Sequence, residues 1–275
     1  MQPHKKHPHI LAALYGQPWA ITDDWLTTIC GIVEKRSEAP IEEFKAAMKP
    51  MEDDSADSPM QMAGDVAIIP VMGPIFPRAN LFTAMSGATS SAGVSDMIDE
   101  ATAKEAKGVV FHFDSPGGAI SGGFEVGNKI ASMTVPTFAC IEGTCASLAY
   151  LWAAQCDRVC VSQASVVGSV SVVMRMMSSD RAARNEGMDI TTIKSGTLKQ
   201  AGDPSTLAFA GQYQSLLTQL NTYHDMFVAA VSTARPKMDM SKVATGDIWI
   251  GQKAVAAGLA DRVCTLADCL AEFEA

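Results

Sequence analysis

Short apolar runs alternate with helix-patterned segments along most of this 275-residue chain. The runs at 66–72, 108–113 and 136–141 are almost continuously apolar, which is typical of strands buried on both faces of a parallel sheet. Segments 91–106 and 124–133 instead repeat apolar residues at helical spacing. This alternation predicts repeated βαβ units around a mainly parallel sheet. We therefore expect an α/β fold whose ligands meet the carboxyl ends of the strands.

The N-terminal part of the chain departs from this pattern. It contains a predicted helix with Leu26 and Ile29 on its apolar face, followed by the acidic stretch 51–59. An acidic stretch of this kind, ending in proline, is typical of a linker between domains. We therefore expect a helical appendage with an acidic linker over residues 1–60 and a main domain over residues 61–275.

Charge and cysteine usage exclude several classes of protein. The formal net charge is −9, so nucleic acid, which requires a basic surface, is not an expected partner. No apolar run reaches the roughly 18 to 20 residues of a membrane span, and we expect no membrane anchor and no signal peptide. The seven cysteines are odd in number, include no Cys-x-x-Cys pair and lie partly in apolar runs. They are predicted to be reduced, buried thiols of a cytoplasmic protein, and neither a metal nor a cofactor is expected.

Ser147 is the candidate nucleophile. It follows the predicted strand 136–141 through a turn of small residues, and a buried helix begins directly after it. The first amides of a helix have no intrahelical acceptor and favour negative charge, so a hydroxyl here is well placed to react. The alternative interpretation is that Ser147 is only the N-cap of that helix. Cys145 is a rival nucleophile, but no histidine nearby would generate its thiolate.

A pair of glycines follows another predicted strand. In the sequence Asp-Ser-Pro-Gly-Gly at 114–118, Gly117 and Gly118 lack a Cβ, so their amides can approach a substrate closely. An amide aimed at a developing oxyanion contributes roughly 3 to 4 kcal/mol to transition-state stabilisation. The alternative interpretation is a tight turn without catalytic function.

The positions of the histidines do not favour a histidine as the base that would activate Ser147. Of five histidines, three lie in the first ten residues, His112 lies in a core strand and His224 lies in the middle of a helix. A lysine can act instead if burial keeps its amine neutral. Lys194 and Lys199, in the predicted loop 194–204, are the candidates, and a hydroxyl such as that of Ser169 could hold the amine in place.

Several of these motifs occur in the order found in a known family. Ser-Pro-Gly-Gly at 115–118, the small-residue serine turn at 143–150, Gly168-Ser169 in a valine-rich strand and Lys-Ser-Gly-x-x-Lys at 194–199 resemble the signal peptide peptidase A family of serine peptidases. The closest likeness is to its phage head-maturation branch, over about residues 65 to 265. The resemblance implies a ClpP/crotonase-like spiral of βαβ units.

The resemblance also implies roles for individual residues. Ser147 matches the nucleophile, Lys199 the general base, and Ser169 the hydroxyl that orients the lysine amine. The oxyanion amides are expected from Gly117 and Gly118, with a contribution from the amide of Leu148. Two residues depart from the family pattern, because Ala149 and Ser171 stand where glycine is usual. Either side chain could crowd the cleft and weaken activity.

The function expected from the resemblance is a serine endopeptidase that cleaves scaffold, portal or coat proteins during phage head maturation. It would act in the host cytoplasm and the prohead, as a homo-oligomer whose sites lie at subunit interfaces; the sequence does not distinguish between Lys199 acting in cis and in trans. Alternatives are a cytosolic protease similar to signal peptide peptidases, a crotonase-like acyl-CoA enzyme, and a catalytically inactive capsid component. The sequence indicates neither the cleavage-site preference nor the ring size.

Overall fold

A computed structural model describes residues 15–36, 59–78, 87–176, 185, 187, 191, 193–196, 198–199 and 210–274. The statements below concern these residues. Most of the acidic stretch 51–59 lies outside them. Among the helices in this part of the chain, none has both the length and the apolar character needed to cross a bilayer.

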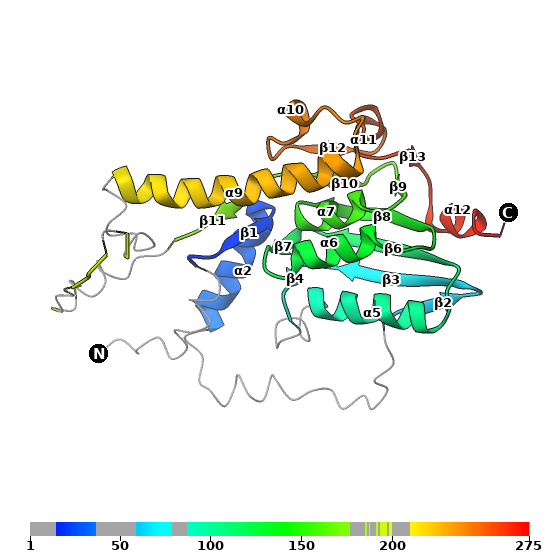
Figure 1. Ribbon diagram of the computed structural model, residues 1–275, viewed down its shortest axis with the longest axis horizontal. Coiled ribbons are helices and arrows are strands. Elements are labelled where there is room, and N and C mark those ends of the chain that lie inside the picture. The colour runs from blue at the N-terminus through cyan, green and yellow to red at the C-terminus, as the bar shows by residue number, and fades with distance from the viewer. Residues whose placement is uncertain are drawn as a thin grey trace.

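The main sheet has eight strands and is mostly parallel, as the alternating pattern predicts (Figure 1). Its principal path runs β12–β10–β8–β6–β3–β2, and β9 and β13 join it beside β8. The strands are β2 (Gln61–Ala63), β3 (Val66–Met72), β6 (Gly108–Ser115), β8 (Thr137–Ala146), β9 (Arg158–Val161), β10 (Val166–Gly168), β12 (Ile248–Ile250) and β13 (Arg262–Val263). Only the edge strands β2 and β12 run antiparallel to their neighbours. The α/β fold is therefore confirmed.

Helices cover both faces of this sheet. The first face carries α5 (Ser91–Ala103), α6 (Gly123–Ala131), α7 (Leu148–Ala154) and the long α9 (Ala210–Ala234) (Figure 1). On β6, Val109, Phe111 and Phe113 point into the core of this face, whereas Val110 points to the other side. That alternation is the two-residue period of a strand. The second face is covered by α12 (Leu266–Ala271), and the short helices α10 (Met240–Val243) and α11 (Gln252–Ala256) precede it in the chain.

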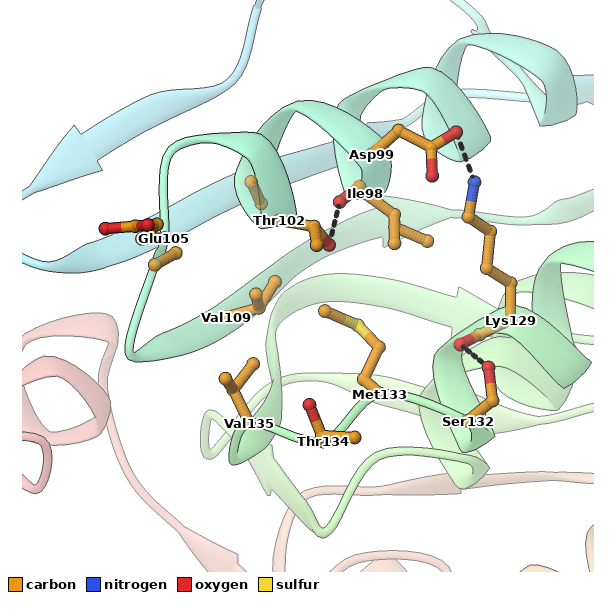
Figure 2. Close-up of a pocket in the computed structure, with 12 residues that line it drawn as sticks. Ile98, Asp99, Thr102, Glu105, Val109, Lys129, Ser132, Met133, Thr134 and Val135 are labelled. Carbon is orange, nitrogen blue, oxygen red and sulfur yellow. Dashed lines mark hydrogen bonds and ion pairs between the residues drawn. The ribbon is translucent and has the colours of Figure 1, made fainter.

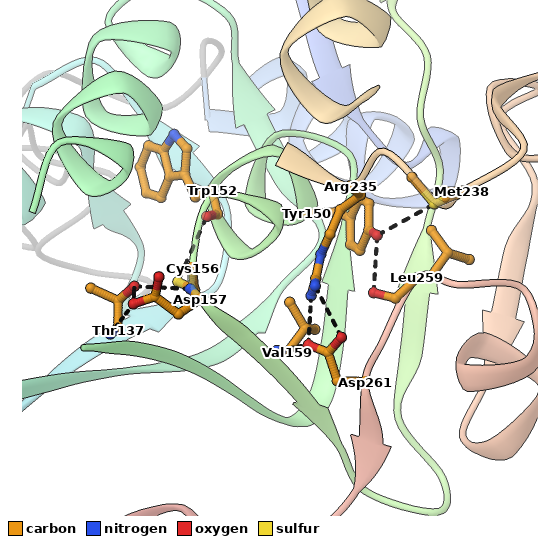
Figure 3. Close-up of polar contacts among 10 residues, drawn as sticks. All are labelled: Thr137, Tyr150, Trp152, Cys156, Asp157, Val159, Arg235, Met238, Leu259 and Asp261. Atoms are coloured by element: carbon orange, nitrogen blue, oxygen red, sulfur yellow. Dashed lines mark hydrogen bonds and ion pairs between the residues drawn. The ribbon is translucent and has the colours of Figure 1, made fainter. Parts of the chain in front are cut away.

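Helix α7 is buried on every side, which explains its unbroken apolar sequence. The Trp152 Nε1–H donates to the Gly123 carbonyl oxygen over 2.7 Å, so the indole is both packed and hydrogen-bonded. The Tyr150 hydroxyl donates to the Leu259 carbonyl oxygen over 2.9 Å (Figure 3). These bonds fix α7, and therefore the residue before it, from two sides.

An ion pair joins the end of α9 to the segment between α11 and β13, which lies beside β9. The Arg235 guanidinium binds both carboxylate oxygens of Asp261, at 3.1 and 2.9 Å (Figure 3). The same carboxylate accepts the Val159 N–H at 2.7 Å. Because Asp261 binds a cation and a backbone amide together, it holds α9, β9 and the C-terminal segment in one arrangement.

A second, five-stranded sheet runs beside the first. Its order is β11 (Val173–Met174), β1 (Pro18–Ile21), β7 (Gly117–Ala119), β4 (Ile75–Phe76) and β5 (Thr89–Ser90). The expected helix near residue 22 is α2 (Asp23–Arg36), which buries Leu26 and Ile29. The strand β1 before it was not expected, and it pairs with strands of the main domain on both sides.

Candidate active site

Ser147 lies at the junction of β8 and α7 in a strained conformation. Its φ is 56° and its ψ is −120°, a region that residues other than glycine rarely occupy and that costs of order 1 to 3 kcal/mol. Its N–H donates to the Gly168 carbonyl oxygen at 2.7 Å, and its carbonyl oxygen accepts the Leu151 N–H at 2.9 Å. Its side chain makes no capping bond to α7. Ser147 thus occupies the N-cap position of α7, but side-chain capping does not explain why a serine stands there.

The Ser147 side chain is buried and points towards the chain after β10. Its Oγ donates to the Ser171 carbonyl oxygen at 3.3 Å, and the residue is 1 % exposed. Ser169, two residues before Ser171, also has a positive φ of 53°, and its N–H donates to the Asp247 carbonyl oxygen at 2.6 Å. Ala149 belongs to the main core cluster, so its methyl group packs into the interior.

Gly117 lies against the start of α7. A Cβ on Gly117 would stand 2.9 Å from the Ala146 carbonyl oxygen and 3.0 Å from the Leu148 nitrogen. Its φ of 98° also requires glycine. The Gly117 N–H donates to Ser115 Oγ at 3.2 Å. The fold thus brings Ser147, Leu148 and the predicted glycine pair together, although the pair lies some thirty residues earlier in the chain.

The two candidate lysines are exposed to solvent. Both Lys194 and Lys199 lie on the surface of the chain, and the Lys199 N–H donates to the Gly196 carbonyl oxygen at 3.2 Å. Within the described residues, no hydrogen bond or ion pair joins the Lys199 amine to Ser147 or Ser169. Among the described residues of a single copy, the candidate nucleophile and Lys199 are therefore not hydrogen-bonded to each other.

The rival residues have structural roles. His112 Nε2 lies 3.0 Å from a Glu142 carboxylate oxygen, as a satisfied histidine of a core strand would. Cys145 is completely buried, and burial raises the pKa of its thiol well above the ordinary value. A thiol that stays protonated is a poor nucleophile, so Cys145 does not compete with Ser147.

A pocket of about 350 Å³ lies elsewhere, between α5 and the turn after α6 (Figure 2). Its lining includes Ile98, Val109 and Met133, and an ion pair of 2.6 Å between Lys129 and Asp99 closes one side. None of the predicted site residues lines it. We therefore assign the pocket no part in the chemistry at Ser147.

One group of side chains in the described part of the chain could hold a metal. The sulfur atoms of Cys160, Cys264 and Cys269 all lie within 4.8 Å of one another, in the interior on the second face of the sheet. No spacing motif in the sequence indicates this group, because its members come from separate elements. All seven cysteines are free and buried, as predicted.

The pairing of β1 with β7, the strand that contains Gly117 and Gly118, is not predicted from the sequence. Pro18–Ile21 reads as a short apolar run before a helix cap, which is compatible with a strand. Nothing in the run itself indicates that it pairs with β7, about a hundred residues later.

Comparison with known proteins places these features in a wider context. The family model described as Peptidase family S49 matches residues 129–275, which is more than half of the chain and includes Ser147, Ser169 and Lys199. A putative protease of Methanocaldococcus jannaschii is 31 % identical over 173 residues, covering 61 % of this chain and 55 % of that protein.

Two phage proteins match over a longer part of the chain. The head-tail preconnector protein GP5 of Enterobacteria phage P21 is 28 % identical over 214 residues, covering 76 % of this chain and 43 % of that protein. Capsid assembly protease C of Escherichia phage lambda is 27 % identical over 215 residues, covering 76 % of this chain and 49 % of that protein. The match thus spans less than half the length of either phage relative.

Proposed function

Because the chain belongs to peptidase family S49, we propose that it is a serine endopeptidase in which Ser147 is the nucleophile and Lys199 the general base. The observation that carries this proposal is the backbone of Ser147, which has a φ of 56° and a side chain that caps nothing. Strain of this kind persists when it presents a reactive group, as in the strand-to-helix turns of other hydrolases.

The proposed reaction begins with attack by Ser147 Oγ on a peptide carbonyl carbon. The amides of Gly118 and Leu148 stabilise the resulting oxyanion, because the Gly117 amide already binds Ser115 Oγ. The Lys199 amine takes the proton from Ser147 and passes it to the leaving amine, which leaves an acyl-enzyme. Lys199 then activates the water that releases the acyl group. Ser169 is the proposed hydroxyl partner of the lysine amine.

We place Lys199 in the site of a neighbouring subunit. In one copy, Ser147 is 1 % exposed, whereas Lys199 is exposed to solvent and therefore available to a second copy. The protein would then be a homo-oligomer with its sites at subunit interfaces. Burial between the subunits would also lower the cost of keeping the amine neutral.

The proposed substrates are proteins of a phage head: scaffold, portal or coat proteins cut during maturation, in the host cytoplasm and the prohead. Support comes from the two phage relatives, one of which is a capsid assembly protease. No cofactor takes part in the proposed chemistry.

Replacing Lys199 with alanine tests the proposed base. We expect turnover of a casein substrate to fall by about a thousandfold or more, since a general base and its nucleophile act as a unit. Labelling of Ser147 by a fluorophosphonate probe should fall as well. Lys194→Ala is the matched control, because it removes an exposed lysine of the same loop, and it should retain activity within about twofold of the wild type. Equal activity in Lys199→Ala and the wild type would exclude this lysine.

Mixing two inactive variants separates action in cis from action in trans. If Lys199 acts on the Ser147 of a neighbour, Ser147→Ala and Lys199→Ala proteins together should recover part of the wild-type activity. If each subunit supplies its own lysine, the mixture should stay as inactive as its components.

A further inference from the structure

The N-terminal strand β1 lies between the two strands that flank Ser147. On one side it pairs antiparallel with β7, which contains Gly117 and Gly118. On the other side it pairs antiparallel with β11, which begins two residues after the Ser171 carbonyl that binds Ser147 Oγ. Residues far apart in the sequence thus enclose β1 beside the candidate nucleophile.

The pairing register directs a carbonyl of β1 at the proposed oxyanion amides. The Thr22 N–H donates to the Pro116 carbonyl oxygen at 3.2 Å, which makes these two residues a hydrogen-bonded pair. Such pairs alternate along an antiparallel ladder, so the next is Ala20 with Gly118, whose N–H therefore faces the Ala20 carbonyl oxygen. The Ala20 oxygen and the Leu148 nitrogen both lie within 3.0 Å of the position that a Cβ on Gly117 would take.

A substrate attacked by Ser147 needs the same place. Its reacting carbonyl must point at the amides of Gly118 and Leu148, and its chain must extend along β7. Because β1 already fills this position, we infer that Pro18–Ile21 is an intramolecular inhibitor that occupies the site of the acyl half of a substrate. This inference rests on the proposed peptidase function and adds the requirement that β1 leaves before a protein substrate binds.

The side chains of β1 indicate what a competing peptide must resemble. Ala20 is 1 % exposed, and its methyl group packs within the main core cluster. Trp19 and Ile21 face the opposite way into a separate cluster, in which Trp19 meets Phe76 edge-on at 6.0 Å. A substrate that replaces β1 is therefore an extended segment with a small residue before the scissile bond.

One set of side-chain contacts between the N-terminal segment and the residue after β11 is open to solvent, whereas Trp19 and Ile21 of β1 are buried. The Arg175 guanidinium, next to β11, donates to Asp23 Oδ1 at 2.6 Å and to Thr27 Oγ1 at 2.7 Å. Exposed pairs of this kind contribute little to stability. The segment is therefore fastened at its outer side by bonds that water can replace, as a releasable inhibitor requires.

A disulfide between β1 and β11 tests whether β1 must leave. Pro18 and Met174 face each other in register, both are half-buried, and all seven native cysteines are buried. The backbone N–H and C=O groups of successive β1 residues point alternately to β7 and β11. Those of Ala20 point to β7, so those of Trp19 point to β11. Pro18 and Met174 are therefore a non-hydrogen-bonded pair. The Cα atoms of such pairs lie about 4.5 Å apart, which suits a disulfide. We expect the oxidised Pro18→Cys/Met174→Cys protein to cleave casein at less than one tenth of its reduced rate.

The outcomes separate this inference from the proposed function. Equal cleavage by the oxidised and reduced forms would overturn the inhibitory role of β1 but would not contradict the proposed peptidase function. Absence of cleavage in both forms and in the wild type, with no fluorophosphonate labelling of Ser147, would overturn the peptidase and the inference with it. The two single-cysteine variants are the controls, and their rates should not depend on the redox state.

A second, independent observation concerns four thiols on the other face of the sheet. Cys140 of β8 and Cys160 of β9 are neighbours in register. The sulfur atoms of Cys264 and Cys269 lie 3.7 Å apart, those of Cys160, Cys264 and Cys269 lie within 4.8 Å of one another, and Cys140 packs in the same buried cluster. Two strands, the chain after β13 and helix α12 thus direct their thiols to one point.

The separation of the Cys264 and Cys269 sulfur atoms matches that in a zinc site. Tetrahedral zinc binds thiolate sulfur at about 2.3 Å, which places the four sulfur atoms about 3.8 Å apart. Arg262 is the register partner of Cys160 and would place a positive charge beside the four thiolates, which it shares with the carboxylate of Glu272. We propose that Cys140, Cys160, Cys264 and Cys269 bind one structural zinc ion, which fastens α12 to the sheet. Each thiol gives up its proton on binding.

Metal analysis of the purified protein tests the zinc site. We expect one zinc per chain in the wild type after dialysis, and less than one tenth of that in Cys269→Ala. Cys156→Ala is the matched control, because Cys156 is buried but lies outside the group, and it should keep its zinc. A folded wild-type protein that contains no zinc after refolding with excess zinc and dialysis would overturn this proposal.

Discussion

Replacing Ser147 with glycine is expected to raise the free energy of unfolding by about 1 kcal/mol while it abolishes peptidase activity. The φ of 56° and ψ of −120° strain any residue with a Cβ, and glycine adopts such angles without that cost. For a chain of this size, the gain corresponds to a rise of about 2 to 4 °C in the melting temperature. Thermal unfolding followed by circular dichroism, together with casein turnover, measures both effects.

Ser147→Ala is the control that separates strain from chemistry. It removes the hydroxyl but keeps the Cβ, so it should lose at least about a thousandfold in turnover without the gain in stability. A glycine variant less stable than the alanine variant would contradict the strain argument. Substantial turnover by either variant would contradict the assignment of Ser147 as the nucleophile.

Replacing Gly118 with alanine is expected to reduce both stability and activity. The new Cβ would stand 2.6 Å from the Ile75 carbonyl carbon, which is backbone of the paired strand β4 and cannot turn aside. Overpacking of this kind costs about 3 kcal/mol or more, and it displaces the Gly118 amide that the proposed mechanism directs at the oxyanion. Urea unfolding should show the loss of stability, and casein turnover should fall by at least about a hundredfold.

Gly31→Ala in α2 provides the matched comparison. A Cβ at Gly31 meets no atom within 4 Å, and alanine is favoured over glycine inside a helix by up to about 1 kcal/mol. This variant should therefore be at least as stable as the wild type. A Gly118→Ala protein with wild-type stability would show that β4 and β7 are not packed as described.

The local sequence determined much of the fold and of the site. Apolar runs such as Gly108–Phe113 and the helical spacing after Ser91 predict the βαβ order, because hydrophobic periodicity is set by residues close in the chain. The turn at Ser147 and the glycine pair follow from the same kind of local signal. Their placement at carboxyl ends of parallel strands then follows from the topology of such folds.

Other features depend on contacts between distant segments, and only the tertiary structure decided them. The backbone angles of Ser147 are held by a bond to Gly168 and by the burial of α7, and neither is visible in the serine turn itself. Pro18–Ile21 has no local property that selects β7 and β11 as its partners. The cysteines of the proposed zinc site converge because β8, β9 and α12 pack together. Pairing and packing across a hundred residues depend on the whole core, whereas a short segment of sequence specifies only its own conformation.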